Sequence, residues 1–302
     1  MQSTLHPAGP EATEVALLWW VMFGASVFIM GLVVGLIAWG LTRATGRERF
    51  AGMPMIVGLG IVFPVVVITP LIVWSVDITS RVRAAITPAV TVEVVGRQFW
   101  WEVRYPGHGI VTANEIRVPV GQPVELVLTT ADVIHSLWFP EIAGKLDMIP
   151  GRANRMVIQA DRAGTFRGQC AEFCGIQHAL MALVLVAEPP DAFEDWATAQ
   201  SQPPPPPEDP FLVWGRDAFL AAGCGTCHAV RGTPAKGTFG PDLSHVGSRV
   251  TLGAGVLPNG IGPLAGWIAD SQAIKPGNHI PAFNTLDGET LRAVAAWLES
   301  LK

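Results

Sequence analysis

Charge is scarce in this chain of 302 residues, since only 15% of them are Asp, Glu, Lys or Arg and the net charge is −5. Nucleic-acid binding is excluded because no excess of basic residues offers a surface for phosphate. Half of the residues are apolar, which excludes an intrinsically disordered chain. The 32 glycines and 25 prolines also exclude a mostly helical protein. The length predicts about two domains.

Cysteine is rare as well. The four cysteines form two close pairs, Cys170 with Cys174 and Cys224 with Cys227, and none is left over. A disulfide framework is typical of short secreted chains with denser cysteine. Close pairs in a chain of this length instead indicate metal or cofactor sites.

Two uncharged apolar runs, residues 17–41 and 53–76, dominate the N-terminal quarter. Each is longer than the roughly 20 residues that a helix needs to cross a bilayer. A signal peptide is the alternative for the first run, but Glu11 and Glu14 precede it without any Lys or Arg, and the run is too long. We therefore expect a two-helix transmembrane hairpin within an N-terminal segment of residues 1–82.

The orientation of this hairpin follows from its connecting loop. Arg43, Arg47 and Arg49 lie in the loop, whereas no basic residue precedes the first run. The positive-inside rule places such a loop in the cytoplasm. Both termini and everything after residue 82 are then expected outside.

Residues 83–188 show a β pattern. Short alternating or β-branched segments are separated by Gly, Pro, Asn and Asp, which predicts a small all-β sandwich or barrel. The segments are residues 91–95, 115–120, 124–128 and 155–159.

At the end of this domain, Cys170, Cys174, His178 and Met181 lie close together in sequence, and His135 lies upstream. Two thiolates, two imidazoles and a thioether form a soft ligand set that suits copper. Zinc would be satisfied by two Cys and two His, and has no use for the methionine. A zinc clip or buried thiols are the alternatives for the cysteine pair alone.

The pattern Cys-x-Glu-x-Cys-x3-His-x2-Met resembles the binuclear CuA domain, a cupredoxin-like sandwich, of subunit II of the haem–copper cytochrome c oxidases. The resemblance implies that Cys170 and Cys174 bridge two coppers and that His135 and His178 supply one imidazole each. Met181 would be a weak ligand, and Glu172 would lend its backbone carbonyl. The side chain of Glu172 would help to hold a magnesium ion at the interface with the catalytic subunit. Residues 145–152, including Asp147, resemble the segment of the family that faces subunit I.

Residues 189–209 form a proline-rich linker with five consecutive prolines at 203–207. Such a tract predicts a semi-rigid polyproline II spacer that keeps the next domain close to the copper domain.

Residues 210–302 contain Cys224-Gly-Thr-Cys227-His228, the attachment motif of c-type haem. A redox dithiol or zinc clip is the alternative for this motif. Helices are expected after the caps Asp209 and Asp287, and their apolar faces are interpreted as core. The first of these faces contains Phe211, Trp214, Ala218 and Phe219.

This region resembles an all-α class I cytochrome c fused to subunit II. By that resemblance His228 is the proximal iron ligand, and the carbonyl of Pro241 holds it.

The distal haem ligand departs from the family pattern. The family has a methionine in Met-Pro-Ala-Phe, but this chain has Ile280 at that position and no methionine beyond Met181. Three alternatives stay open: His279, the less favoured His245, or an open coordination position. Histidine in place of methionine should lower the haem potential, because Met/His ligation raises it.

Two further departures concern electron and proton entry. The family commonly begins an aromatic run with a tryptophan at the docking surface for cytochrome c, whereas here the run is Phe99, Trp100 and Trp101. We hypothesise that a tethered haem relaxes the demand for that external contact; packing of the sandwich is the alternative role. Many relatives also carry a glutamate about two turns before a proline of the second span. Residues 57–60, before Pro64, contain no carboxylate.

The sequence therefore predicts the electron-entry subunit of a terminal cytochrome c oxidase, anchored by two spans in a bacterial inner membrane with its soluble domains on the periplasmic side. Electrons would pass from an external cytochrome c through haem c to the copper pair. The catalytic subunit I would then reduce oxygen to water, with no bond chemistry in this chain. A membrane-tethered sensor of a diatomic gas and a stand-alone electron shuttle are the alternatives.

Overall fold

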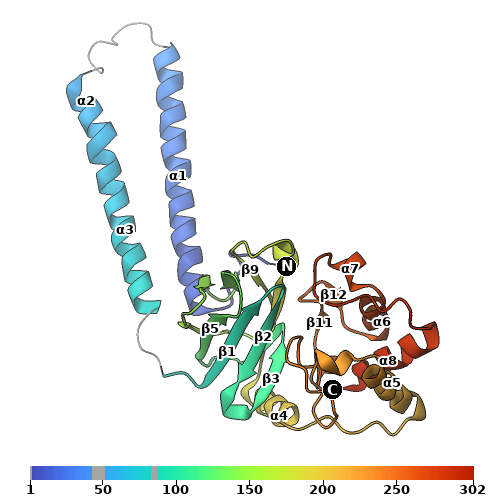
Figure 1. Ribbon diagram of the computed structural model, residues 1–302. Coiled ribbons are helices and arrows are strands. Elements are labelled where there is room, and N and C mark those ends of the chain that lie inside the picture. Colours follow the sequence, from blue (N-terminus) through green and yellow to red (C-terminus); the bar gives the residue numbers. More distant parts are fainter. Residues whose placement is uncertain (1, 43–51, 83–86) are drawn as a thin grey trace. The chain divides into compact units, whose positions relative to one another are not determined.

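The computed structural model describes residues 2–42, 52–82 and 87–302 (Figure 1). The loop arginines Arg43, Arg47 and Arg49 lie outside the described residues. The chain divides into two compact units, Thr13–Ala85 and Met1–Ala12 with Ile86–Lys302. The first residues of the chain therefore belong to the soluble unit and not only to the predicted N-terminal anchor. For example, the amide of Ala8 donates to the carbonyl of Glu141 at 2.6 Å.

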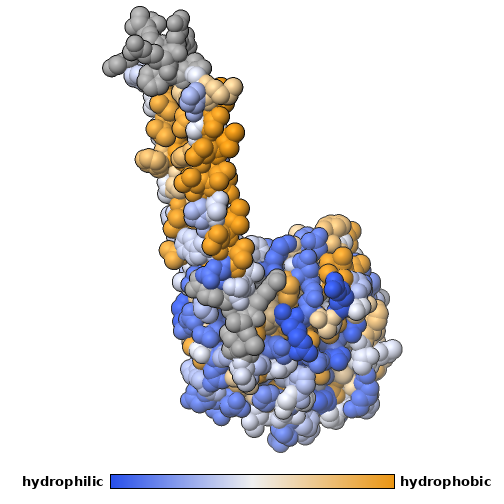
Figure 2. Space-filling view, turned by 90° about the vertical axis from the view of Figure 1, so that its left-hand side faces the viewer, coloured by the Kyte–Doolittle hydropathy of each residue, from blue (hydrophilic) through white to orange (hydrophobic). Residues whose placement is uncertain are grey.

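The helical unit contains α1 (Pro10–Thr42) and a second long helix made of α2 (Met53–Val57), the π-helical turn η2 (Gly58–Val62) and α3 (Phe63–Val82). In the described part of the chain, these are the two helices long and apolar enough to cross a membrane. Figure 2 shows that their surface is mostly hydrophobic. The π turn ends just before Pro64, which has no N–H to donate to the carbonyl four residues back.

The copper-domain region, residues 87–188, is a sandwich of two five-stranded sheets. The first sheet has the order β3 (Ile110–Ala113), β2 (Trp100–Tyr105), β1 (Val90–Arg97), β5 (Val124–Thr130) and β8 (Asn154–Ile158). The second has the order β4 (Glu115–Pro119), β10 (Ala182–Glu188), β9 (Gly164–Cys170), β6 (His135–Trp138) and β7 (Leu146–Met148). Alternate residues of β1, such as Val92 and Val94, are fully buried between the sheets. Two single turns, η3 (Pro106–His108) and η4 (His178–Leu180), complete this domain.

The haem-domain region, residues 210–302, is mainly helical. Its elements are α5 (Pro210–Ala221), η5 (Cys224–Thr226), η6 (Val246–Ser248), β11 (Thr251–Leu252), β12 (Leu257–Pro258), α6 (Ile261–Ala269), α7 (Ser271–Ile274) and α8 (Gly288–Ser300). The carboxylates of Asp209 and Asp287 accept backbone N–H groups at the starts of α5 and α8, as predicted.

The buried face of α5 agrees with the predicted one at Phe219 and at the partly buried Ala218, but not at Trp214. Trp214 is 38% exposed, whereas Gly215 and Phe219 are buried against α8. A Cβ on Gly215 would lie 2.1 Å from the carbonyl oxygen of Ala293, so only glycine permits this close helix crossing. The apolar stripe alone could not reveal this, because the residue that sets the contact has no side chain.

The linker also differs from the extended spacer that its composition predicts. Residues Pro190–Ser201 form helix α4, which packs against β3 and β4 (Figure 1). Phe193 and Ala197 are buried there, and the ring of Phe193 lies 6.4 Å from that of Tyr105. The apolar residues recur at helical spacing, and this periodicity outweighs the proline content. The irregular connection is therefore only residues 202–209.

The sandwich and the haem domain are joined by hydrogen bonds within one compact unit. The amide of Val250 donates to the carboxylate of Glu115 at 2.8 Å, and the amide of Ala182 donates to the carbonyl of Ala254 at 3.0 Å. The guanidinium of Arg167 donates to the carbonyl of Gly255 at 3.1 Å. These bonds, and others described below, fix one face of the haem domain against the sandwich.

Candidate copper and haem sites

The five candidate copper-binding side chains converge on one point in the sandwich. The two sulfurs of Cys170 and Cys174 lie 3.8 Å apart. Nδ1 of His135 is 3.8 Å from the sulfur of Cys170, and Nδ1 of His178 is 3.7 Å from that of Cys174. The thioether of Met181 lies 3.7 Å from the sulfur of Cys174. This set has one imidazole beside each thiol, and the donor atoms of His135, Cys170 and Cys174 lie close enough together to hold a metal ion.

Neighbouring strands bring these residues together. His135 begins β6, which pairs with β9, and Cys170 ends β9 opposite Leu137. The chain then loops back so that the amide of Cys170 donates to the carbonyl of Met181 at 2.9 Å. A Cβ on Gly96 would lie 2.7 Å from the ring of His135, so this glycine makes room for the ligand.

The backbone also contributes. The carbonyl of Glu172 lies 3.2 Å from the sulfur of Cys170, where a metal held by that thiolate could accept it as a further ligand. The side chain of Glu172 is half-buried, as is that of Asp147 in β7. In this structure the two carboxylates have no recorded contact with each other, so the predicted magnesium site rests on the family resemblance.

The electrostatics of the cluster favour a thiolate. The contact between the two thiols, with His135 beside them, lowers the pKa of Cys170 and raises that of Cys174. Burial opposes the charged form of His135, but its contacts with Cys170 and Asp132 outweigh burial and raise its pKa. A site that favours thiolate sulfur in a buried pocket suits a soft metal.

Asp132 orients His135 and was not singled out by the sequence. Its carboxylate lies 2.7 Å from Nε2 of His135 and also accepts the amide of Gln98 at 2.6 Å. An acceptor at Nε2 keeps a proton there and leaves Nδ1 free to bind a metal. The spacing of Asp132 three residues before His135 was the available signal, but it is too common to identify such a role.

A cavity of about 320 Å³ is lined by the haem-attachment candidates Cys224, Cys227 and His228. Nδ1 of His228 lies 2.8 Å from the carbonyl of Pro241. A Cβ on Gly240 would lie 2.5 Å from the imidazole of His228, so the ring fills the space that a side chain would take. Burial lowers the pKa of His228, although the Pro241 carbonyl opposes this, and a neutral imidazole is the form that binds iron.

The cavity also contains a buried cation. Arg249 lines it, and its Nε has no partner within the described part of the chain. A buried guanidinium with an unpaired N–H fits a group that carries carboxylates, as haem does. The paired cysteines, the held histidine and this cation together fit covalent haem.

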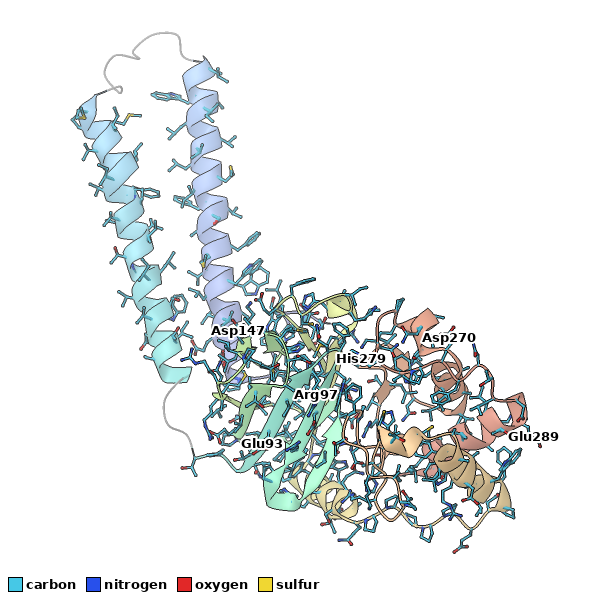
Figure 3. The ribbon with its side chains drawn as sticks, in the orientation of Figure 1. Glu93, Arg97, Asp147, Asp270, His279 and Glu289 are labelled. Carbon is cyan, nitrogen blue, oxygen red and sulfur yellow. The ribbon has the colours of Figure 1, made fainter. Side chains whose placement is uncertain are left out.

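The distal candidates lie in different surroundings. His279 and Ile280 both line the cavity, and the exposed ring of His279 lies 5.9 Å from that of Phe239 (Figure 3). His245 is buried but does not line the cavity, and its Nε2 lies 2.9 Å from the carbonyl of Gln202. Of the two histidines, the structure thus brings only His279 to the haem cavity.

The aromatic run divides between two environments. Phe99 is only 7% exposed and lines the cavity, as Trp100 does. Trp101 is fully buried in the sandwich, with its ring 5.9 Å from that of His135. Arg97 stacks over Trp100 at 5.6 Å and also lines the cavity (Figure 3). Phe99 therefore faces the haem domain of its own chain and not a surface open to another protein.

Comparisons with known proteins agree with this division. A model of the cytochrome c oxidase subunit II periplasmic domain matches residues 108–188, and a cytochrome c model matches residues 213–302. The chain is 30% identical to cytochrome c oxidase subunit 2 of Bacillus subtilis, over 83% of this chain and 72% of that protein.

Two further relatives carry the same name. Cytochrome c oxidase subunit 2 of Alkalihalophilus pseudofirmus is 39% identical over 70% of this chain, and that of Bacillus sp. strain PS3 is 34% identical, also over 70%. The chain spans about three fifths of the length of these two proteins (61% and 62%). Among solved structures, the periplasmic domain of subunit II of cytochrome oxidase (CoxB) of Bradyrhizobium japonicum is 30% identical. The match covers 38% of this chain and 95% of that one, with a TM-score of 0.37.

The copper-ligand cluster, the haem-attachment cavity and these similarities lead to one conclusion. The chain belongs to the cytochrome c oxidase subunit 2 family, as a membrane-anchored member that carries a cytochrome c domain after its copper domain.

Proposed function

We propose that this chain is the electron-entry subunit of a terminal cytochrome c oxidase. It takes electrons from an external cytochrome c through covalent haem c to a binuclear copper centre, and passes them to the catalytic subunit I, where oxygen is reduced to water. When bound, the haem and the copper pair supply one-electron redox chemistry. The chain itself makes and breaks no bond in this process.

In this proposal, Cys170 and Cys174 would supply the thiolates that hold the two coppers. His135 and His178 would supply one imidazole each, Met181 would be a weak ligand, and the carbonyl of Glu172 would complete the set. The distances of 3.7–3.8 Å between each imidazole nitrogen and its thiol sulfur support this division. The buried strands around the cluster hold the ligands in place, so the protein has little to rearrange when an electron arrives.

For the haem, Cys224 and Cys227 form the two covalent links and His228 is the proximal ligand. The carbonyl of Pro241 orients the ring so that Nε2 is left for iron. His279 is the distal candidate that lines the cavity, and an open position is the alternative. The engagement of His245 with Gln202 argues against that histidine.

A carbon monoxide difference spectrum of the reduced full chain tests the distal position. An unchanged haem spectrum would mean a firmly held sixth ligand, with His279 leading. Rapid binding would mean an open position and would favour the gas-sensing alternative. The variant His279→Ala separates the cases, because it should open a closed haem to carbon monoxide.

The membership of the family supports the proposals on location and partners that follow. We propose a two-pass subunit of a bacterial inner membrane, with both termini and the soluble domains on the periplasmic side. Subunit I, with other oxidase subunits, would be the partner at the helices and around Glu172 and Asp147, where a magnesium ion would bind.

One observation carries the proposal: the copper-ligand candidates and the haem cavity lie in one compact unit. Phe99 lines the haem cavity, and its ring lies beside Gly175, the residue after the copper-ligand candidate Cys174. The test is purification of the full chain from membranes in detergent. We expect the catalytic subunit at stoichiometric amount, and loss of oxygen consumption in Cys170→Ser. A chain that runs alone with its copper and haem in place would contradict the role in an oxidase.

A further inference from the structure

Two loops that carry candidate ligands meet where the domains touch. The copper loop, residues 174–178, begins and ends with copper-ligand candidates, and the distal loop, residues 275–280, contains His279. The buried side chain of Gln177 donates from Nε2 to the carbonyl of Pro276. A Cβ on Gly277 would lie 2.9 Å from Cγ2 of Ile176, so the side chain of Ile176 packs closely against the backbone of Gly277.

A buried lysine forms hydrogen bonds with both domains at the same contact between the two loops. Lys275 is 2% exposed, and its Nζ donates to the carbonyl of Phe99 at 2.8 Å and to that of Gly253 at 3.0 Å. One carbonyl belongs to the sandwich and the other to the haem domain. Within the described residues no carboxylate pairs with this amine, although an unpaired buried cation is costly. Packing alone would be better served by an apolar side chain, so the position calls for a donor.

From Phe99 the contact continues to a copper ligand. The neighbouring Gln98 donates from Nε2 to the carbonyl of Cys174 at 2.6 Å. The ring of Phe99 lies beside Gly175, where a Cβ would be 3.1 Å from Cε1 of the ring. Lys275 is thus linked through two adjacent residues of the sandwich to the start of the copper loop.

On the other side, the contact continues to the distal position. Asn278 donates from Nδ2 to the carbonyl of Lys275 at 2.7 Å and accepts the amide of Ile280 at 2.8 Å through Oδ1. The side chain of Asn278 therefore ties the two ends of the distal loop together. A displacement of Lys275 would move His279 and Ile280 relative to the cavity.

We propose that Lys275 and Gln177 are positioning residues that seat the distal loop of the haem domain on the copper loop. They hold the distal side of the haem cavity in place and maintain the contact through which an electron passes between the domains. Only the statement about electron transfer rests on the proposed electron-entry function. The contact between the two loops is a property of the chain itself.

The test uses the full chain in the purified oxidase, with two variants that break the junction from opposite sides. Lys275→Met keeps an unbranched side chain that is one heavy atom shorter and removes the donor. Gln177→Leu removes the donor of the copper loop and leaves a similarly bulky apolar side chain. The control is Lys236→Met, the same substitution at an exposed lysine of the haem domain. Hydrogen–deuterium exchange follows residues 98–100 and 275–280. Flash-induced reduction of the haem gives the rate of transfer to copper.

We expect both variants to speed exchange in both segments by about tenfold or more, as the loss of a buried hydrogen bond implies. Transfer from haem to copper should slow by a similar factor. The later transfer from copper to the catalytic subunit should stay unchanged, because neither side chain forms a hydrogen bond with a copper-ligand atom.

Exchange and transfer rates equal to those of Lys236→Met in both variants would overturn the inference. If Lys275→Met fails to fold, Gln177→Leu, which keeps the lysine, decides the question. If the unmodified oxidase shows no transfer from haem to copper, the proposed function fails. The hydrogen–deuterium exchange rates would still test whether Lys275 and Gln177 hold the two loops together.

Discussion

Replacement of Asp132 by asparagine should weaken copper binding without any change to a copper ligand. The carboxylate of Asp132 lies 2.7 Å from Nε2 of His135 and accepts the amides of Gln98 and Val133 at 2.6 and 2.7 Å. Asparagine has the same size, but it lacks the charge and has only one acceptor oxygen for three donors. Loss of such an orienting partner typically costs about 10–100-fold in metal affinity, or about 1.4–2.7 kcal/mol.

The assay is a titration of the full chain with a competing copper chelator, followed by the thiolate-to-copper absorption. Asp195→Asn, at an exposed position of α4, is the matched control. The haem spectrum of each variant reports whether the soluble unit is folded. A copper affinity of Asp132→Asn within about twofold of the control would refute the view that this carboxylate orients His135.

Three further predictions follow from the contacts. Gly215→Ala should destabilise the chain by about 1–3 kcal/mol in urea unfolding, because its Cβ would meet the carbonyl of Ala293. The control Gly266→Ala should not destabilise the chain in this way, because a Cβ at that position meets nothing within 4 Å. An equal loss of stability in the two variants would contradict the reasoning. Phe99→Ala should slow haem-to-copper transfer, since Phe99 is buried in the wall of the haem cavity. An unchanged rate in pulsed reduction would contradict a role of the ring in this transfer and would agree with the hypothesis that the tethered haem relaxes the demand for this contact. Burial lowers the pKa of Lys275 from 10.5 to about 7, so between these pH values the unfolded chain binds more protons. Stability relative to Lys275→Met should therefore rise with pH through this window in denaturant titrations, and a fall would contradict the burial of this amine.

The clustering of the candidate ligands could be predicted from the sequence, because most of each set occupies a short segment with fixed spacing. Cys170, Cys174, His178 and Met181 span one loop, and only His135 had to be brought from another strand. The haem motif is contiguous from Cys224 to His228. The caps Asp209 and Asp287 are likewise local signals, since a carboxylate at a helix start accepts N–H groups only one to three residues away.

The contacts between the domains could not be predicted. Lys275 is a charged residue that is expected at the surface, and only its tertiary position shows that it is buried between two carbonyls. Helix α4 was not predicted, because the prolines around it indicated an extended linker, although Phe193 and Ala197 have helical spacing. The burial of Phe99 beside the haem domain could not be predicted either, because burial against a second domain leaves no signal in local sequence.

The transfer of a single electron between the two centres tests the central claim most directly. In the purified full-length oxidase, one electron is delivered to the haem by a light-activated reductant, and the absorption of haem and copper is followed in time. The account predicts that haem oxidation and copper reduction proceed at one common rate, and that Cys170→Ser leaves the haem reduced. A haem that stays reduced in the unmodified protein, or copper that is reduced equally fast in Cys224→Ala/Cys227→Ala, would contradict it.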